Sequence, residues 1–220
     1  MLARSDYRRL QPRFKHVALH AGEVLYAPGD AVRFIYFPND AVVSLIFDVD
    51  THRTLEVAME GNEGAVGFAI RLGGVRSHNI SIVRDAGTAT RIEVAALARC
   101  AKRGGLLQSL LDKYVHALVI HIAQLSVCNR FHSIDERLAR WLMMTRDRVG
   151  SDEFVATQES IANYLGVRRS GITAAASSFQ KQNMIDYRRG HIEILDKPGL
   201  SATACPCYGI IKRQYDSFLN

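Results

Sequence analysis

The strongest constraint on this fold is a change in hydrophobic pattern near Val94. From Val17 to about Glu93, short runs of β-branched and aromatic residues alternate with turns that contain glycine, proline, asparagine or aspartate. Beyond Val94, apolar residues recur every three or four positions, as they do in helices. The sequence therefore predicts an α+β chain. Its strand-rich half, with turns at roughly ten-residue intervals, favours a β-roll of the jelly-roll type.

A long helix is predicted between Leu106 and Phe131, with about seven turns. Its apolar stripe consists of Leu107, Leu111, Tyr114, Leu118, Ile122 and Leu125. This spacing approximates a heptad repeat, so the stripe predicts the seam of a two-helix homodimer. Packing of the helix on its own β-half is the alternative. A new helix follows, because Ser133 and Glu136 have the spacing of a capping box and Gly150 can end it.

The segment after Val155 has the order of a winged helix-turn-helix. Thr157 can cap a first helix, and Gly166 supplies the positive φ of a tight turn. A second helix is predicted from about Arg169 to Gln182, with small residues that allow close packing. The sequence "IDYRRGHIEIL" then predicts two strands joined at Arg189 and Gly190, which would form the wing.

Basic residues occupy the positions that would meet DNA. Between Gln158 and His191, five Lys or Arg residues stand against two Asp or Glu residues. Arginine can neutralise phosphate or bind the guanine edge, and the second helix of this motif enters the major groove. The predicted DNA-binding residues are Thr157, Gln158, Arg168, Arg169, Ser170, Thr173, Arg188 and Arg189. We expect Arg169, Ser170 and Thr173 at base edges, Arg168 on phosphate, and the wing arginines on the DNA backbone.

The chain resembles the Crp–Fnr family of bacterial transcription regulators. The stretch "TQESIANYLGVRRSGITAAASSFQKQNMI" matches the family's helix-turn-helix without a gap, and "GEVLYAPGD" and "GNEGAVGF" fit its β-half. The resemblance implies a degenerate cyclic-nucleotide-binding-like sensor domain at residues 1–105 and a dimerisation helix at 106–131. Residues 132–220 would form a winged-helix DNA-binding domain with a C-terminal tail.

Two departures from the family pattern concern the ligands. In the recognition helix, Arg169 matches the family's first arginine, but Ser170 and Ala174 replace its glutamate and second arginine, so base readout should differ. In the effector pocket, Phe68 and Asn79 stand where cyclic-nucleotide-binding members carry glutamate and arginine. Neither replacement can make the same charged contacts. Cyclic AMP is therefore not expected, although Arg71 lies near enough in the sequence to contribute to a rebuilt pocket.

No cofactor is predicted. No cysteine precedes Cys100, which argues against an iron–sulfur cluster of the family's type, and scattered histidines give little support for haem. Cys205 and Cys207 are weak candidates for a soft-metal site, because a C-x-C pair supplies two ligands; two ordinary buried cysteines are the alternative. Cys128 is expected in the core or the dimer seam.

The predicted function is sequence-specific transcription regulation by a homodimer on a pseudo-palindromic double-stranded operator. A ligand-binding or scaffold protein of the same fold that no longer reads DNA is the alternative. RNA polymerase and a small-molecule effector of unknown identity are further candidate partners. No catalytic motif is present, so an enzyme is not expected. The lack of eighteen consecutive apolar residues and of a signal peptide predicts a cytoplasmic protein without membrane contact.

Overall fold

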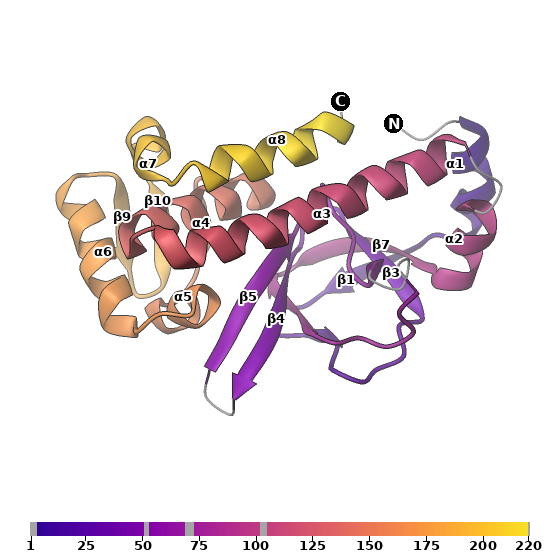
Figure 1. The fold of residues 1–220 in the computed structure, drawn as a ribbon, viewed down its shortest axis with the longest axis horizontal. Helices are drawn as coiled ribbons and strands as arrows, with labels where there is room; N and C mark the ends of the chain where they lie inside the picture. Colours follow the sequence, from indigo (N-terminus) through magenta and orange to yellow (C-terminus); the bar gives the residue numbers. More distant parts are fainter. Residues whose placement is uncertain (1–3, 51–52, 69–72, 102–104, 220) are drawn as a thin grey trace.

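The computed structural model describes residues 4–50, 53–68, 73–101 and 105–219. Figure 1 shows a β-rich part and a helical part at opposite ends of the molecule, with one long helix running between them. The predicted α+β architecture, with a β-roll followed by a long helix and a winged helix-turn-helix, is confirmed. Among the described residues, none of the helices combines the length and apolar character that a membrane span requires.

The β-rich part consists of two antiparallel sheets with the strand orders β1-β7-β3 and β2-β6-β4-β5. The strands are β1 Lys15–Leu19, β2 Val24–Tyr26, β3 Phe34–Pro38, β4 Val42–Asp50, β5 Arg53–Glu60, β6 Ile80–Asp85 and β7 Gly87–Glu93. Helix α1 (Arg4–Leu10) and the short 3-10 helix η1 (Gln11–Arg13) precede them, and α2 (Val94–Ala101) follows. Tyr36, Val43, Val83 and Ala89 are among the buried residues that fill the roll.

Helix α3 (Leu106–Phe131) has the bounds that the sequence predicts. Its predicted dimer stripe, however, is largely covered by the same chain. The buried members are Leu107, Leu111, Tyr114 and Leu125. Helix α8 (Cys207–Leu219) returns along α3 and contributes Ile211 and Tyr215 to their cluster (Figure 1). These four residues are therefore covered within their own chain by α8 and the β-roll, which is the packing that the sequence offered as the alternative to a dimer seam.

The remaining two members of the stripe are more accessible. Leu118 is half-buried, and Ile122 is exposed. Other exposed apolar side chains on α3 are Val119, Val127 and Phe131. Val119 lies one helical turn from Ile122, and Val127 and Phe131 lie one turn from each other further along the helix. The described chain thus leaves an apolar face of the C-terminal half of α3 uncovered.

The helical part begins with α4 (Ile134–Val149) and forms its own core. The predicted capping box is present, with Ser133 and Glu136 bonded reciprocally, and Gly150 ends the helix in the left-handed conformation. The elements that follow are β8 Glu153–Val155, α5 Gln158–Leu165, α6 Arg169–Lys181, β9 Ile185–Arg188, β10 His191–Ile194 and α7 Lys197–Thr203. The three strands form an antiparallel sheet of order β8-β10-β9.

Strand β5 joins the two parts of the chain. The indole N–H of Trp141 in α4 donates to Glu56 Oε1 at 3.2 Å, and Tyr164 in α5 stacks on the indole. Ser44 donates to the other Glu56 oxygen at 2.5 Å. Burial is the main reason that the pKa of Glu56 is raised, and Arg84 opposes the rise. The helix-turn-helix is thus packed directly on the β-roll of its own chain.

Candidate nucleic-acid interface

The first helix of the motif is held by its caps. The Thr157 hydroxyl accepts from the backbone N–H of Ser160 at 3.1 Å, which satisfies one free donor of α5. At the other end, Gly166 has φ 61° and ψ 40°, the left-handed conformation that glycine adopts readily. The Val167 N–H then bonds to the Ala162 carbonyl at 3.0 Å. These contacts fix the turn that the sequence predicts.

Helix α6 buries one face and exposes the other. The buried side consists of Ile172, Ala175, Ala176 and Phe179, as predicted. Gly171 lies so close to α4 that a Cβ there would come within 2.7 Å of Ile134 Cδ1. Small residues therefore bring α6 against α4 and hold it firmly. Arg169, Ser170 and Thr173 all lie on the exposed side.

The exposed N-terminal end of α6 is basic and has polar links to α5. Arg169 is 67% exposed in its side chain, and its Nε lies 3.8 Å from Glu159 Oε2. The Thr173 hydroxyl donates to Gln158 Oε1 at 2.6 Å. Arg168 is the N-cap residue of the helix, and its side chain makes no capping hydrogen bond to the described first turn of α6. The first backbone N–H groups of α6 therefore remain suited to an anion such as phosphate.

The wing is a two-residue hairpin. Arg188 pairs with His191, so Arg189 and Gly190 alone form the loop. Both loop residues have positive φ, 52° and 88°, as a type I′ turn requires. The Arg188 side chain is 82% exposed and lies 3.1 Å from Asp186 Oδ1. Arg188 at the end of β9 and Arg189 in the loop place two adjacent arginines on the surface. The Tyr187 hydroxyl anchors the hairpin by donating to the Ala156 carbonyl at 2.7 Å.

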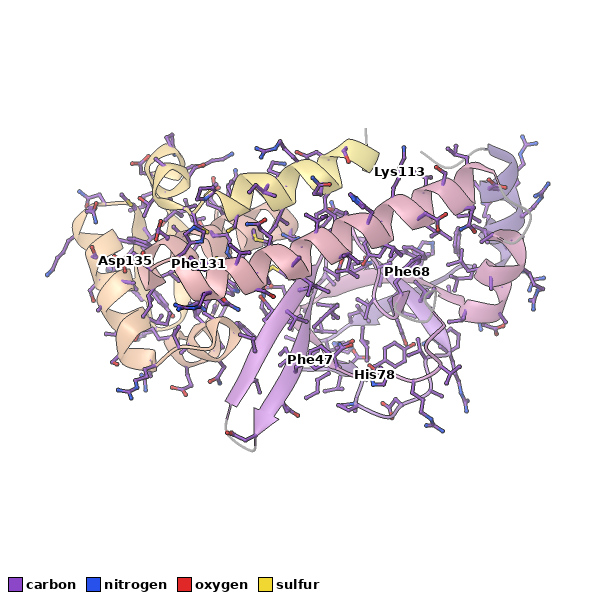
Figure 2. All side chains as sticks on the ribbon, in the orientation of Figure 1. Phe47, Phe68, His78, Lys113, Phe131 and Asp135 are labelled. Carbon is purple, nitrogen blue, oxygen red and sulfur yellow. The ribbon has the colours of Figure 1, made fainter. Side chains whose placement is uncertain are left out.

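The predicted effector-pocket residues do not come together around an open site. Phe68 lies next to α3 (Figure 2). It is 2% exposed and packs edge-on against the Tyr114 ring of α3, with centroids 5.0 Å apart. The Asn79 amide donates to Ser81 Oγ at 3.1 Å, within the β-roll. Arg71 lies outside the described residues. Phe68 thus occupies space between the roll and α3 and presents an apolar ring where a nucleotide site would need a charged group.

A cavity of about 520 Å³ lies beside Phe68, between the β-roll and α3. Its lining includes Phe37, Leu97, Leu107 and Tyr114, and it is mostly apolar. Such a lining suits a small apolar ligand better than a cyclic phosphate, because an unpaired phosphate charge would be costly against hydrocarbon.

A group of sulfur and nitrogen ligands that the sequence analysis did not bring together lies where α3 meets the last helices. Cys128, His132, Cys205 and Cys207 place their ligand atoms within 4.8 Å of one another. A hydrogen bond with Cys205 lowers the pKa of the Cys128 thiol. The C-x-C spacing pointed only to Cys205 and Cys207 as metal ligands. The overlooked signal is the spacing of Cys128 and His132, four residues apart and therefore on one side of the helix end.

Comparison with known protein families matches residues 136–203 to the Crp-like helix-turn-helix domain. The match spans α4, the helix-turn-helix, the wing and α7. This part of the chain is therefore a Crp-like helix-turn-helix domain. No curated protein matched the chain.

Solved structures of Crp/Fnr regulators share the fold over most of the chain. FixK2 from Bradyrhizobium japonicum has a TM-score of 0.75 at 13% identity, covering 87% of this chain and 98% of its own. The c-di-GMP-responsive global regulator CLP from Xanthomonas campestris has a TM-score of 0.70 at 14% identity, with coverage of 87% and 99%. A Crp/Fnr transcriptional regulator from Thermus thermophilus has a TM-score of 0.67 at 16% identity, with coverage of 86% and 98%. The β-roll, long helix and winged helix of this chain together form the Crp/Fnr regulator fold.

Proposed function

We propose that this protein is a sequence-specific DNA-binding transcription regulator that acts as a homodimer and does not depend on cyclic AMP. The observation that carries the proposal is the exposed basic N-terminal end of α6, beside a wing with two arginines. A Crp-like helix-turn-helix places this end in the major groove, where side chains reach base edges. The β-roll contacts α4 through Glu56 and Trp141, while Arg169, Ser170 and Thr173 of α6 remain exposed.

The predicted contacts divide into two kinds. Arg169, Ser170 and Thr173 share the exposed side of α6 and are proposed to read bases. Arg168, Arg188 and Arg189 are proposed to bind phosphate, together with the first N–H groups of α6. Thr157 and Gln158 lie at the start of α5, where the Gln158 side chain already positions Thr173.

The dimer is proposed to form through the exposed face of α3. Val115, Val119 and Ile122 are spaced four and three residues apart, the heptad pattern of a two-helix seam, and Ser126 continues the spacing with a small polar side chain. Val119 is 52% exposed and Ile122 39% exposed in the single chain. A second copy would cover this strip by symmetry. Of the stripe predicted from the sequence, Ile122 alone lies on this exposed face.

Independence from cyclic AMP is supported by the packing of Phe68. Its ring is buried against Tyr114 and offers no carboxylate to a ribose. Asn79 is bonded to Ser81 and carries no charge for a phosphate. An apolar effector in the 520 Å³ cavity and contact with RNA polymerase are further expectations of this proposal.

The proposal is tested by selecting duplex fragments from a random library with and without cyclic AMP. We expect the same pseudo-palindromic site to be enriched in both conditions. Arg169→Ala should weaken discrimination at one base position in each half-site by ~1–3 kcal/mol, because a direct base contact has that value. Lys212→Ala is the control, since it also removes one positive charge but lies on α8. Lack of enrichment, or enrichment that requires cyclic AMP, would contradict the proposal.

The dimer is tested separately by Val119→Asp. A charge in the centre of a covered apolar strip should convert the protein to a monomer, because the carboxylate would be buried without a partner. Val75→Asp makes the same change at a valine of the β-roll that is 72% exposed. Sedimentation equilibrium should show a dimer for the wild type and for Val75→Asp. A dimer that survives Val119→Asp would place the interface elsewhere.

A further inference from the structure

Three cysteines and a histidine from two segments far apart in the sequence converge behind the DNA-binding domain. Cys128 lies near the end of α3, His132 is the residue that ends this helix, and Cys205 and Cys207 flank Pro206 at the start of α8. The sulfur atoms of Cys128 and Cys205 lie 3.5 Å apart. The Cys207 sulfur lies 3.5 Å from His132 Nδ1. Other His, Cys, Asp and Glu side chains within the described ranges form no comparable group.

We propose that these four residues bind one Zn²⁺ ion in a closed tetrahedral site. Zinc lies about 2.3 Å from thiolate sulfur and about 2.0 Å from imidazole nitrogen, so a tetrahedron has S···S edges of about 3.8 Å and S···N edges of about 3.6 Å. The observed 3.5 Å contacts are close to both values, and all four ligand atoms lie within 4.8 Å. One small ion therefore reaches every ligand after shifts of up to about 1 Å. Three thiolates and one imidazole are a ligand set that favours zinc.

The surroundings suit an occupied site. Three thiolates and one Zn²⁺ carry a net charge of −1, and such a charge is costly in the interior unless positive groups lie nearby. Arg137 and Arg140 of α4 are 7% and 3% exposed and interact with Cys128. The Gln124 amide donates to the Cys207 sulfur at 3.2 Å, the kind of outer contact that orients a metal-bound thiolate. His132 is half-buried, which leaves an entry path for the ion.

The geometry fits a metal better than the two simpler explanations. A disulfide between Cys128 and Cys205 would use two of the four groups and leave the contact between Cys207 and His132 without a role. Ordinary core cysteines pack against hydrocarbon, whereas the cluster of buried residues here contains only the three cysteines themselves. The His132 imidazole lies at the edge of this cysteine cluster with its Nδ1 facing the Cys207 sulfur, and it supplies the fourth ligand of a four-coordinate site.

The site would link the junction between α3 and α4 to the segment that precedes α8. His132 joins α3 to α4, with φ −104° and ψ 147°, and Ser133 begins the capping box of α4. A bound ion would connect this junction and Cys128 to the segment between α7 and α8. Given the proposed function, the metal would fix the angle between the dimer helix and the DNA-binding domain. The metal site itself stands independently of DNA binding.

The test uses the full chain, stripped of metal under reducing conditions and titrated with Co²⁺ as a spectroscopic probe. We expect the visible bands of tetrahedral cobalt and a near-ultraviolet sulfur-to-cobalt band, saturating at one ion per chain and bleached by Zn²⁺. Cys207→Ser and His132→Gln should each weaken Co²⁺ binding by more than about 100-fold, since loss of outer partners alone costs about 10–100-fold. Cys100→Ser is the matched control, because this remaining cysteine lies in α2, outside the site.

His132→Gln keeps the test decisive if the buried Cys207→Ser variant fails to fold, because its side chain lies at the rim. A wild-type chain without the tetrahedral cobalt spectrum would overturn the proposal. Equal loss of binding in Cys100→Ser would also overturn it. A chain that binds cobalt in this way but never selects a duplex would support the metal site while refuting the proposed function.

Discussion

Glu60 gives the stability of this protein a pH dependence that one substitution should remove. The carboxyl group lies at the end of β5 and is fully buried, so close to Gly64 that a Cβ there would overlap it. Burial raises the pKa of Glu60 from 4.5 to about 8, and Glu63 adds to the rise. Arg148 opposes the rise, but its Nε is already paired with Glu63 Oε1 at 2.7 Å. Two carboxylates thus face one arginine, and Glu60 is the one that stays protonated.

The direction of this pH dependence follows from the number of protons bound in the folded and unfolded states. Between pH 4.5 and about pH 8, the folded chain holds a proton on Glu60 that the unfolded chain has lost, so the free energy of unfolding falls as the pH rises. The stability that protonated Glu60 contributes is fully present below pH 4.5 and is lost as the pH rises above about 8. At about 1.4 kcal/mol per pH unit, the fall has an upper bound of about 5 kcal/mol.

Glu60→Gln replaces the group with a neutral one of the same shape. We expect the variant to match the wild type near pH 5 and to exceed it by a few kcal/mol near pH 8.5, up to the bound of about 5 kcal/mol. Urea unfolding of both proteins from pH 5 to pH 9 measures this, at one protein concentration. Glu153→Gln, at an exposed position on β8, should leave the slope unchanged. Equal slopes in Glu60→Gln and the wild type would refute the reasoning.

Two further substitutions test how the effector region and the recognition motif are held. Phe68→Ala removes the buried phenyl ring that packs against Tyr114, so it should lower the free energy of unfolding by about 3–5 kcal/mol and enlarge the adjoining cavity. Urea unfolding measures the first effect and binding of an apolar dye the second. A loss below about 1 kcal/mol would show that the ring is not packed there. Gly166→Val forces a β-branched residue to φ 61° and places its Cβ 2.9 Å from Leu55 Cδ1. The variant should lose more than about 1 kcal/mol of unfolding free energy and bind the duplex more weakly. Gly22→Val, at φ 85° with open space around it, separates the backbone cost from the loss of packing.

Elements governed by neighbours in the chain were predictable from the sequence. The capping box at Ser133, the left-handed Gly166 and the two-residue turn at Arg189 depend on a few adjacent residues, and each was found where expected. The bounds of α3 were predictable for the same reason, because few helix-breaking residues lie between Leu106 and Phe131. The exposed side of α6 followed from the positions of its small and apolar residues.

The tertiary structure alone decided which face of α3 is covered and which residues of the last helices it meets. An amphipathic stripe such as Leu107 to Leu125 shows that a face is buried, but not whether the covering surface comes from a second copy or from the same chain. Here α8 returns along α3 and covers it. That return also carries Cys205 and Cys207 to Cys128, across 77 residues of sequence between Cys128 and Cys205. Contacts of this kind depend on where the whole chain runs, and periodicity within one helix holds no information about that path.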